Sequence, residues 1–160
     1  MNYRVKQQGF TLVELLVVIS IIAILAGILL PTVIGAFKKA SDAQVRTELK
    51  SIETAVKAFV NEYSKLPLED ADQGRSPDVH LNDDAKSKLL IRKLIGENPR
   101  KIVFLEGNTS DGTFLDPWDV QYKMYLDSNY DNRVEFGTNR IYSQVVVYST
   151  GSGTNIFSFK

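Results

Sequence analysis

The chain contains no cysteine, so neither a disulfide bond nor a thiolate metal site can form in it. It also lacks an excess of charge of either sign: 19 Lys and Arg residues balance 19 Asp and Glu residues, and the formal net charge is zero. Proteins that bind nucleic acid in general carry a clear positive excess. We therefore expect no disulfide framework and no nucleic-acid partner.

Sequence signatures of enzymes are missing as well. The chain has no Gly-x-Ser-x-Gly nucleophile turn, no phosphate-binding loop and no His-Glu-x-x-His zinc motif. His80 is the only histidine, and it follows a polar stretch without a nucleophile pattern around it. We interpret His80 as a solvated side chain, and we expect a protein without catalytic residues or enzymatic activity.

The most informative feature that is present is a hydrophobic run near the N-terminus. Between Leu12 and Leu30 the only charged residue is Glu14. As a helix this run would be about 28 Å long, close to the thickness of the hydrocarbon core of a bilayer. A carboxylate inside such a run is costly in lipid and is by default a functional hypothesis. The run therefore predicts a membrane helix with a functional residue near its start.

A short basic leader, with Arg4 and Lys6, precedes the hydrophobic run and ends at Gly9. One alternative is an ordinary secretory signal, but such signals have a shorter apolar region, and their cleavage site follows that region. Here the candidate cleavage glycine comes first, so a cut there would leave the helix on the mature protein. A plain membrane anchor is the second alternative.

The junction of leader and run resembles the prepilin signature of type IV pilins and type II secretion pseudopilins; it reads Gly9-Phe10-Thr11-Leu12-Val13-Glu14-Leu15-Leu16. In that family a membrane peptidase cuts after the glycine and methylates the new N-terminal residue. The resemblance thus implies that Gly9 and Phe10 are processing residues. We further expect Glu14 to pair with the freed α-amine of Phe10 on a neighbouring subunit, the alternative being a carboxylate that only reaches the lipid headgroups.

The helix is predicted to continue beyond the membrane run. Apolar residues recur at three- or four-residue steps, which indicates one face of an amphipathic helix; together with Ser41 they are Ile34, Phe37, Val45, Leu49, Ile52, Val56, Phe59 and Tyr63. Pro67 disfavours a helical conformation in the residue before it, so the helix should end near Leu66. The predicted helix, residues 10–66, would be about 85 Å long.

Pro31 lies inside this predicted helix. Proline lacks the backbone N–H and its ring clashes with the preceding turn, so we predict a kink or local melting there. Either Pro31 is a passive break between anchor and domain, or it is a flexible joint used in assembly. Pilin-like proteins commonly have a proline at this place.

The C-terminal part reads as a small mixed domain. After a polar loop from Pro67 to Asp84, a short helix from about Ala85 to Ile95 is predicted, with Asp83 or Asp84 as its N-cap. Strands are predicted at residues 101–105, 120–126, 134–136, 142–148 and 155–159, the third pairing with the second and the last with the fourth. The fold class is therefore α+β, with a long N-terminal helix packed on a small antiparallel sheet, as in type IV pilins. The predicted domains are 1–9 (leader), 10–30 (membrane helix), 31–66 (amphipathic helix) and 67–160 (globular domain).

A second resemblance lies in Asp116-Pro117-Trp118, which is similar to the Asp-Pro-Trp-Gly-x-Pro-Tyr motif of the major pseudopilin. Asp119 replaces the family's glycine and Gln121 its proline, whereas Tyr122 matches. The alternative is a simple turn that begins at Asp-Pro, with the indole packed on the sheet. Either way, the motif predicts a structural role.

Calcium is the one metal that the sequence suggests. The major pseudopilin carries an acidic calcium loop near its C-terminus, but the matching stretch, residues 148–155, has no carboxylate. A second candidate has oxygen side chains at alternate positions, as in the first half of a calcium loop: Asp127, Asn129, Asp131 and Glu135. Thr138 stands where such a loop has its bidentate glutamate. The alternative is a hairpin turn rich in Asn and Asp.

The resemblance implies a structural subunit of a periplasmic pseudopilus that drives type II protein secretion. Its implied partners are further copies of the chain, the prepilin peptidase, other pseudopilins and an inner-membrane assembly platform. The implied location is a single pass through the inner membrane with the C-terminal domain in the periplasm. Alternatives are a pilin or minor pilin of an adhesion, motility or DNA-uptake filament, and a membrane-anchored binding domain.

Overall fold

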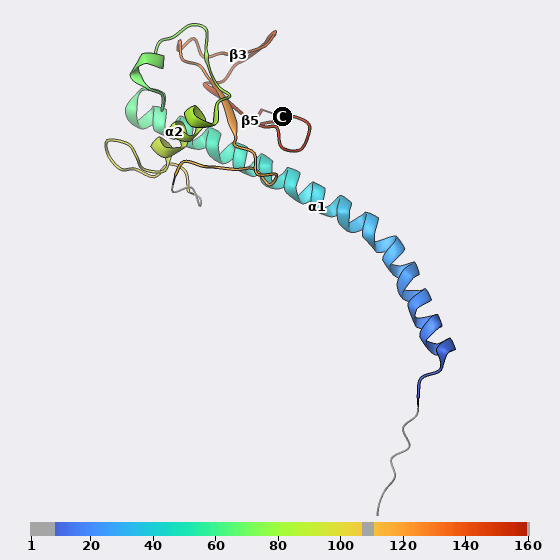
Figure 1. Ribbon diagram of the computed structural model, residues 1–160. Coiled ribbons are helices and arrows are strands. Elements are labelled where there is room, and N and C mark those ends of the chain that lie inside the picture. The colour runs from blue at the N-terminus through green and yellow to red at the C-terminus, as the bar shows by residue number, and fades with distance from the viewer. Residues whose placement is uncertain (1–8, 107–110, 160) are drawn as a thin grey trace, which may run out of the picture. The chain divides into compact units, whose positions relative to one another are not determined.

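The computed structural model describes residues 9–106 and 111–159 of the chain (Figure 1). Two compact units divide it, Met1–Ala40 and Ser41–Lys160, and each is described by itself below. The long helix α1 (Leu12–Tyr63) contributes residues to both units.

In the first unit, α1 stays helical through Pro31, and Figure 1 shows a smooth curve rather than a break. The local melting expected at Pro31 is therefore absent. Proline removes only one bond of the helix ladder, the one to the carbonyl of Gly27. The next residue, Thr32, donates its hydroxyl to the carbonyl oxygen of Ile28 at 2.9 Å, which adds a bond in the same turn.

In the second unit, the apolar face predicted for the later part of α1 is confirmed. Its buried residues are Val45, Leu49, Ile52, Ala55, Val56 and Phe59. The helix ends at Tyr63, slightly before the predicted end, because Ser64 adopts a left-handed conformation with φ of 53°. Its N–H still bonds the carbonyl oxygen of Val60 at 2.8 Å. A left-handed residue just after the last turn is a common way to end a helix.

The predicted short helix is also confirmed, as α2 (Asp84–Leu94). Asp83 is its N-cap, and a side-chain oxygen of Asp83 accepts a hydrogen bond from the Ala85 N–H at 3.0 Å. Leu90, Ile91 and Leu94 are fully buried. The helix thus closes one side of the core that α1 begins.

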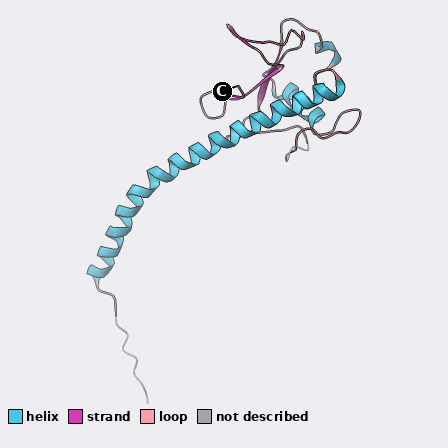
Figure 2. Cartoon of the chain, turned by 180° about the vertical axis from the view of Figure 1, so that it is seen from behind, coloured by secondary structure: helices cyan, strands magenta, loops and turns pink. Residues whose placement is uncertain are grey.

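A four-stranded antiparallel sheet packs against the C-terminal half of α1 (Figure 2). Its order is β1 (Val79–Leu81), β2 (Lys123–Leu126), β5 (Val145–Ser149) and β6 (Ile156–Phe157). The pairing of β5 with β6 confirms the predicted C-terminal hairpin. Strand β1 was not predicted, because three residues inside a polar loop are too few to show an alternating pattern.

One predicted strand and one predicted strand pairing were wrong. Residues 101–105 form no strand: the N–H groups of Phe104 and Leu105 both bond the carbonyl oxygen of Leu94 instead, at 2.8 and 3.1 Å. Strand β3 (Val134–Phe136) does form, but it pairs with β4 (Asn139–Ile141) in a separate hairpin. Gly137, with φ of 60°, allows the tight turn between them.

The sheet is covered on both faces. Met124 and Leu126 point into the core, whereas the neighbouring Tyr125 lies on the opposite face and packs edge-on against Phe136 of β3, with ring centroids 5.0 Å apart. We call the ring cluster on this opposite face the outer aromatic cluster; it consists of His80, Tyr125, Phe136, Tyr148 and Phe157. Its packing explains why all five residues of the central strand β5 are buried.

Candidate functional site: the start of the long helix and the loops around Asp116 and Asp127

The predicted assembly residue Glu14 caps its own helix. The Thr11 N–H and the Thr11 hydroxyl both donate to Oε2 of Glu14, at 2.9 and 2.7 Å. In return, the Glu14 N–H donates to the Thr11 hydroxyl oxygen at 3.2 Å. This reciprocal pair is a capping box, which satisfies donors that a helix start would otherwise leave unpaired. In lipid such donors have no water to bond, so the capping box satisfies N–H groups that would otherwise stay unpaired there.

Both processing residues are accessible just before the helix. Gly9 is exposed and nothing crowds its α-carbon, and the Phe10 side chain is 83% exposed. Neither residue belongs to α1, which begins at Leu12. A peptidase must reach the peptide bond that it cuts, and this exposed junction outside the helix is accessible. The predicted leader before Gly9, with Arg4 and Lys6, lies outside the described residues.

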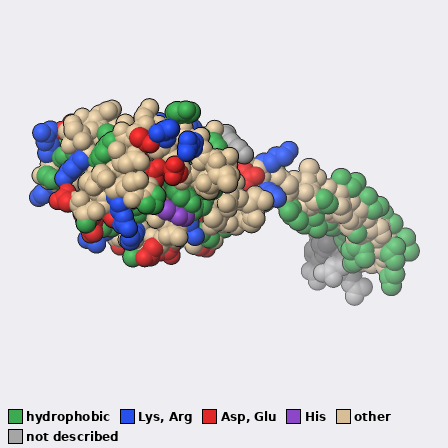
Figure 3. Space-filling model, turned by 90° about the horizontal axis from the view of Figure 1, so that it is seen from above, with side chains coloured by type: hydrophobic (Ala, Val, Ile, Leu, Met, Phe, Trp, Pro, Cys, Tyr) green, Lys and Arg blue, Asp and Glu red, His purple; other side chains and the backbone are tan. Residues whose placement is uncertain are grey.

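From Leu15 to Leu30, α1 has an apolar surface without charged residues. The most apolar window of the helix has a mean hydropathy of 2.9, and none of that window is buried within the chain. Figure 3 shows hydrophobic side chains covering this stretch, whereas charges of both signs are mixed over the globular unit. Its few hydroxyl groups are satisfied within the helix, as with Ser20, which donates to the carbonyl oxygen of Leu16 at 2.8 Å. This surface is suited to lipid or to other helices of the same kind.

In the globular unit, Asp116 of the Asp-Pro-Trp motif joins two loops. The residue is buried, with 4% of its surface exposed. One carboxylate oxygen accepts the N–H groups of Trp118 and Val120, at 2.9 and 3.0 Å. The other accepts the Ser149 hydroxyl at 2.5 Å and the Gly151 N–H at 3.2 Å. A side chain at Gly151 would place its Cβ 2.4 Å from this oxygen, so only glycine fits there.

Tyr122, the last residue of that motif, connects it to α1. The tyrosine is fully buried, and its hydroxyl donates to Oε2 of Glu48 at 2.5 Å. Burial, followed by the hydrogen bond and the charge of Glu48, raises the pKa of Tyr122. The hydroxyl therefore stays protonated as a donor. The motif has the structural role predicted for it, because it ties the loop between α2 and β2 to the long helix.

The candidate calcium residues form a tight turn between β2 and β3. Asp127 accepts the N–H groups of Asp131 and Asn132 on its two oxygens, at 3.0 and 2.7 Å. Asn129 also accepts the Asp131 N–H, and Asp131 accepts the Arg133 N–H, at 2.9 and 3.0 Å. These bonds match the hairpin-turn alternative, and they orient three oxygen-bearing side chains around one short loop.

Glu135, the fourth candidate ligand, is oriented differently. It lies on the exposed face of β3, with a carboxylate oxygen 3.8 Å from the Arg140 guanidinium. Within residues 9–106 and 111–159, no group of three or more His, Cys, Asp or Glu side chains is arranged to hold a metal ion. The four candidate side chains are not arranged as a calcium site in this structure, and calcium binding stays a prediction.

Asp78 lies close to this loop and was not singled out from the sequence. One of its oxygens accepts the Glu135 N–H at 3.0 Å, and the other is buried with no hydrogen-bond partner among the described residues. Burial, and then the charges of Asp127 and Asp131, raise the pKa of Asp78. The loop is therefore electrostatically strained in its ionised form, which a cation or a proton would relieve.

His80 is not the solvated side chain that the sequence indicated. It lies on β1 and stacks on Tyr125 with ring centroids 3.7 Å apart and planes 7° from parallel. Its Nε2 is hydrogen-bonded to the Tyr148 hydroxyl at 2.8 Å. Burial, and then the charge of Lys123, lower the pKa of His80, whereas burial and Tyr125 raise that of Tyr148 to about 12. The arrangement holds three strands together.

These features differ in how far the sequence could have revealed them. The capping box has a sequence signature, Thr-x-x-Glu before an apolar run, which Thr11 and Glu14 match. The roles of Asp78 and Glu48 have none, because each partner lies tens of residues away in the chain.

Comparison with known proteins bears directly on the N-terminal junction. Residues 4–30 match the model of the prokaryotic N-terminal methylation motif. Over 118 residues the chain is 30% identical to the type II secretion system core protein G of Vibrio cholerae, and the alignment covers 74% of this chain and 70% of that protein. The chain belongs to the family of type II secretion system core protein G, the major pseudopilins.

Pilins are also among the relatives of this pseudopilin. The type IV major pilin protein PilA of Myxococcus xanthus is 38% identical over 61 residues, which is 38% of this chain but 28% of that protein. The fimbrial protein EcpB of Eikenella corrodens is 37% identical over 100 residues, which is 58% of this chain and 62% of that protein. The chain thus spans less than two thirds of these two relatives. No solved structure matches it.

The fold agrees with this membership. A long N-terminal helix, apolar in its first part and packed on a small antiparallel sheet in its second, is the architecture of a type IV pilin-like protein. Helix α1 is also long and apolar enough to cross a membrane. The pseudopilin is therefore a membrane-anchored protein, and its relatives imply prepilin processing and assembly into a filament.

Proposed function

We propose that the chain is the structural subunit of a periplasmic pseudopilus that drives type II protein secretion. Three features at the start of α1 carry the proposal together: the accessible Gly9–Phe10 junction, the capping box that contains Glu14, and an apolar helix surface that is not buried within the chain. An apolar helix surface of this kind is stable only in lipid or against other apolar helices. Assembly with further copies provides the second environment.

The proposed sequence of events begins in the inner membrane, with the leader in the cytoplasm and the unit Ser41–Lys160 in the periplasm. Prepilin peptidase cuts after Gly9 and methylates Phe10. An inner-membrane assembly platform then adds the mature chain, together with other pseudopilins, to a growing filament. In this proposal the protein works by assembly and carries out no catalysis.

The experiment compares cells of the source organism with and without the prepilin peptidase. With the peptidase, the protein purified from membranes should begin at a methylated Phe10, and overproduction should yield filaments that can be sheared from the cells. In a second strain, deleting the gene that encodes this chain should leave exported proteins in the periplasm. A mature chain that begins at Met1, or normal secretion after deletion, would contradict the proposal.

The second candidate function is a type IV pilin of an adhesion, motility or DNA-uptake filament. The similarity to the fimbrial protein of Eikenella corrodens supports it. The two functions separate in the same deletion strain, since loss of a pilin would impair attachment, movement or DNA uptake and leave secretion intact.

A further inference from the structure

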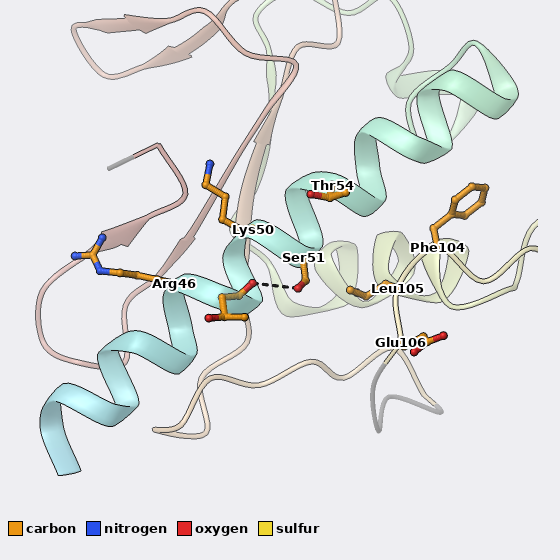
Figure 4. Close-up of a pocket in the computed structure, with 8 residues that line it drawn as sticks. Arg46, Lys50, Ser51, Thr54, Phe104, Leu105 and Glu106 are labelled. Atoms are coloured by element: carbon orange, nitrogen blue, oxygen red, sulfur yellow. Dashed lines mark hydrogen bonds between the residues drawn. The ribbon is translucent and has the colours of Figure 1, made fainter. Parts of the chain in front are cut away.

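A groove runs along the outer side of α1 in the globular unit, between the helix and the segment that follows α2. Its volume is about 670 Å³, within the range of ligand-sized cavities. Figure 4 shows its two walls: one is formed by successive turns of α1, the other by Phe104, Leu105 and Glu106. The residues of the helix wall are Arg46, Thr47, Lys50, Ser51 and Thr54.

The helix wall is built for close approach of another helix. The Thr47 hydroxyl donates to the carbonyl oxygen of Ala43 at 3.0 Å. The Ser51 hydroxyl donates to the carbonyl oxygen of Thr47, also at 3.0 Å (Figure 4). Both hydroxyl groups are therefore already satisfied within α1. Thr47, Ser51 and Thr54 form a row of short side chains with Arg46 and Lys50 beside it, and such rows allow the backbone of a second helix to come near.

The chain also contains a short apolar segment that needs a cover. The hydrocarbon core of a bilayer takes up about 20 helical residues, so a span that begins at Leu12 ends near Pro31. Val33, Ile34 and Phe37 follow at once and are 45%, 67% and 70% exposed. A span of that length leaves this part of α1 beyond the lipid tails, so removing these apolar side chains from water would favour contact with another apolar surface.

We propose that the groove binds residues 33–37 of a second copy of this chain; the inference rests on the proposed filament function. Within one chain, the groove wall and the segment belong to the same continuous helix, so a second copy must supply the segment. Different surfaces of the two copies then meet, which is a heterologous contact. Repeated contacts of this kind build an open helical filament instead of a closed ring.

The charges around the groove set the direction of the incoming helix. Lys38 and Lys39 follow the apolar segment directly, and Glu106 on the loop wall forms no ion pair with any described residue. On the helix wall, Lys50 already pairs with Glu53 at 2.9 Å. Glu106 is therefore the partner that the wall offers to the incoming lysines, and this pairing selects one register.

The absence of native cysteine allows a clean crosslinking test. Full-length Phe37→Cys and Ser51→Cys chains, distinguished by two epitope tags, are produced together, and whole membranes are treated with a mild oxidant. We expect a mixed disulfide dimer, and no such dimer from either variant alone. The matched control replaces Ser51→Cys by Tyr142→Cys, a position that is 81% exposed outside the groove.

Crosslinking in whole membranes separates this inference from the proposed function. If the parent chain forms filaments but the Phe37–Ser51 pair crosslinks no better than the Phe37–Tyr142 pair, the groove contact is wrong and the filament function stands. If the parent forms no filaments under any condition, the proposed function is wrong. As a second measurement, Thr54→Trp should fill the groove and lower filament yield severalfold, whereas Tyr142→Trp should not.

Discussion

At the scale of single residues, Glu14 combines helix capping with the charge that the assembly hypothesis requires, and the sequence alone does not separate the two. Its carboxylate closes a capping box with Thr11 inside one chain, and both bonds from Thr11 end on Oε2. The box involves the Thr11 N–H and hydroxyl, so removal of the leader before Phe10 leaves it intact. The charge remains available for the α-amine of a neighbouring subunit, as the assembly hypothesis requires.

Substitutions at Glu14 can therefore separate the cap from the charge. Glutamine also closes capping boxes, so Glu14→Gln keeps the helix start but removes the charge, whereas Glu14→Ala removes both. We expect both variants to insert, lose the leader and assemble poorly, with Glu14→Asp intermediate. Filament yield and the length of the mature chain measure this.

Thr11→Ser is the matched control, because it retains the box and the charge and should assemble like the parent. If Glu14→Gln assembles normally while Glu14→Ala does not, the carboxylate acts only as a cap. If both assemble normally, the proposed pairing with the α-amine is wrong.

At the scale of elements, the turn between β2 and β3 is where calcium would act. Asp127, Asn129 and Asp131 already direct oxygens around one loop, and the uncompensated charge of Asp78 lies beside them. A ligand that binds only the folded state stabilises it by mass action, by about 2.7 kcal/mol at a concentration 100-fold above its Kd. The fragment Ser41–Lys160 should therefore melt at a higher temperature in millimolar calcium than in chelator.

The calcium effect should disappear in Asp127→Asn, which loses the charge and one of the two acceptor oxygens, so the variant is compared with itself in calcium and in chelator. Asp70→Asn is the matched control, since the Asp70 side chain is 92% exposed elsewhere in the unit. Equal melting temperatures of the parent fragment with calcium and with chelator would leave only the turn interpretation.

The stability of the globular unit should also depend on pH, through His80 on strand β1. The pKa of His80 is lowered in the folded chain, so the folded state binds fewer protons than the unfolded state near the ordinary pKa of about 6.5. Its contribution to stability is thus complete above that pH and is lost as the pH falls below it. The free energy of unfolding of the fragment should decrease from pH 7.5 to 5.5.

His80→Phe keeps the stack on Tyr125 but cannot titrate, so it is the matched variant. The raised pKa of Asp78 acts in the opposite direction and is common to both chains. Denaturant unfolding at the two pH values should show a larger loss for the parent than for the variant. Equal losses would mean that His80 does not couple protonation to folding.

At the scale of the whole molecule, burial separates the two units. The buried residues of α1 begin at Val45, in the unit Ser41–Lys160, whereas large apolar side chains from Phe10 to Phe37 are exposed. The globular unit thus has its own core, in which α1, α2 and the sheet meet. The apolar half has none within the chain, and this difference is what makes the protein dependent on lipid or on further copies.

Local patterns were sufficient for the helices and for the membership of the family. The apolar run from Leu12 and the three- to four-residue period of Val45, Leu49, Ile52 and Phe59 depend only on neighbours within a few turns. The Asp83 cap is equally local. The same holds for the junction Gly9–Phe10, whose resemblance to the prepilin signature agrees with the methylation motif found at residues 4–30.

Tertiary structure alone decided which short segments pair and which polar side chains meet. Strand β1 exists because Val79 to Leu81 pairs with β2, which lies far along the chain. Residues 101–105 have a strand-like composition, yet the N–H groups of Phe104 and Leu105 bond the carbonyl oxygen of Leu94 at the end of α2. Such choices depend on partners distant in sequence, and so do the contacts of Asp78, His80 and Glu48, which no local pattern encodes.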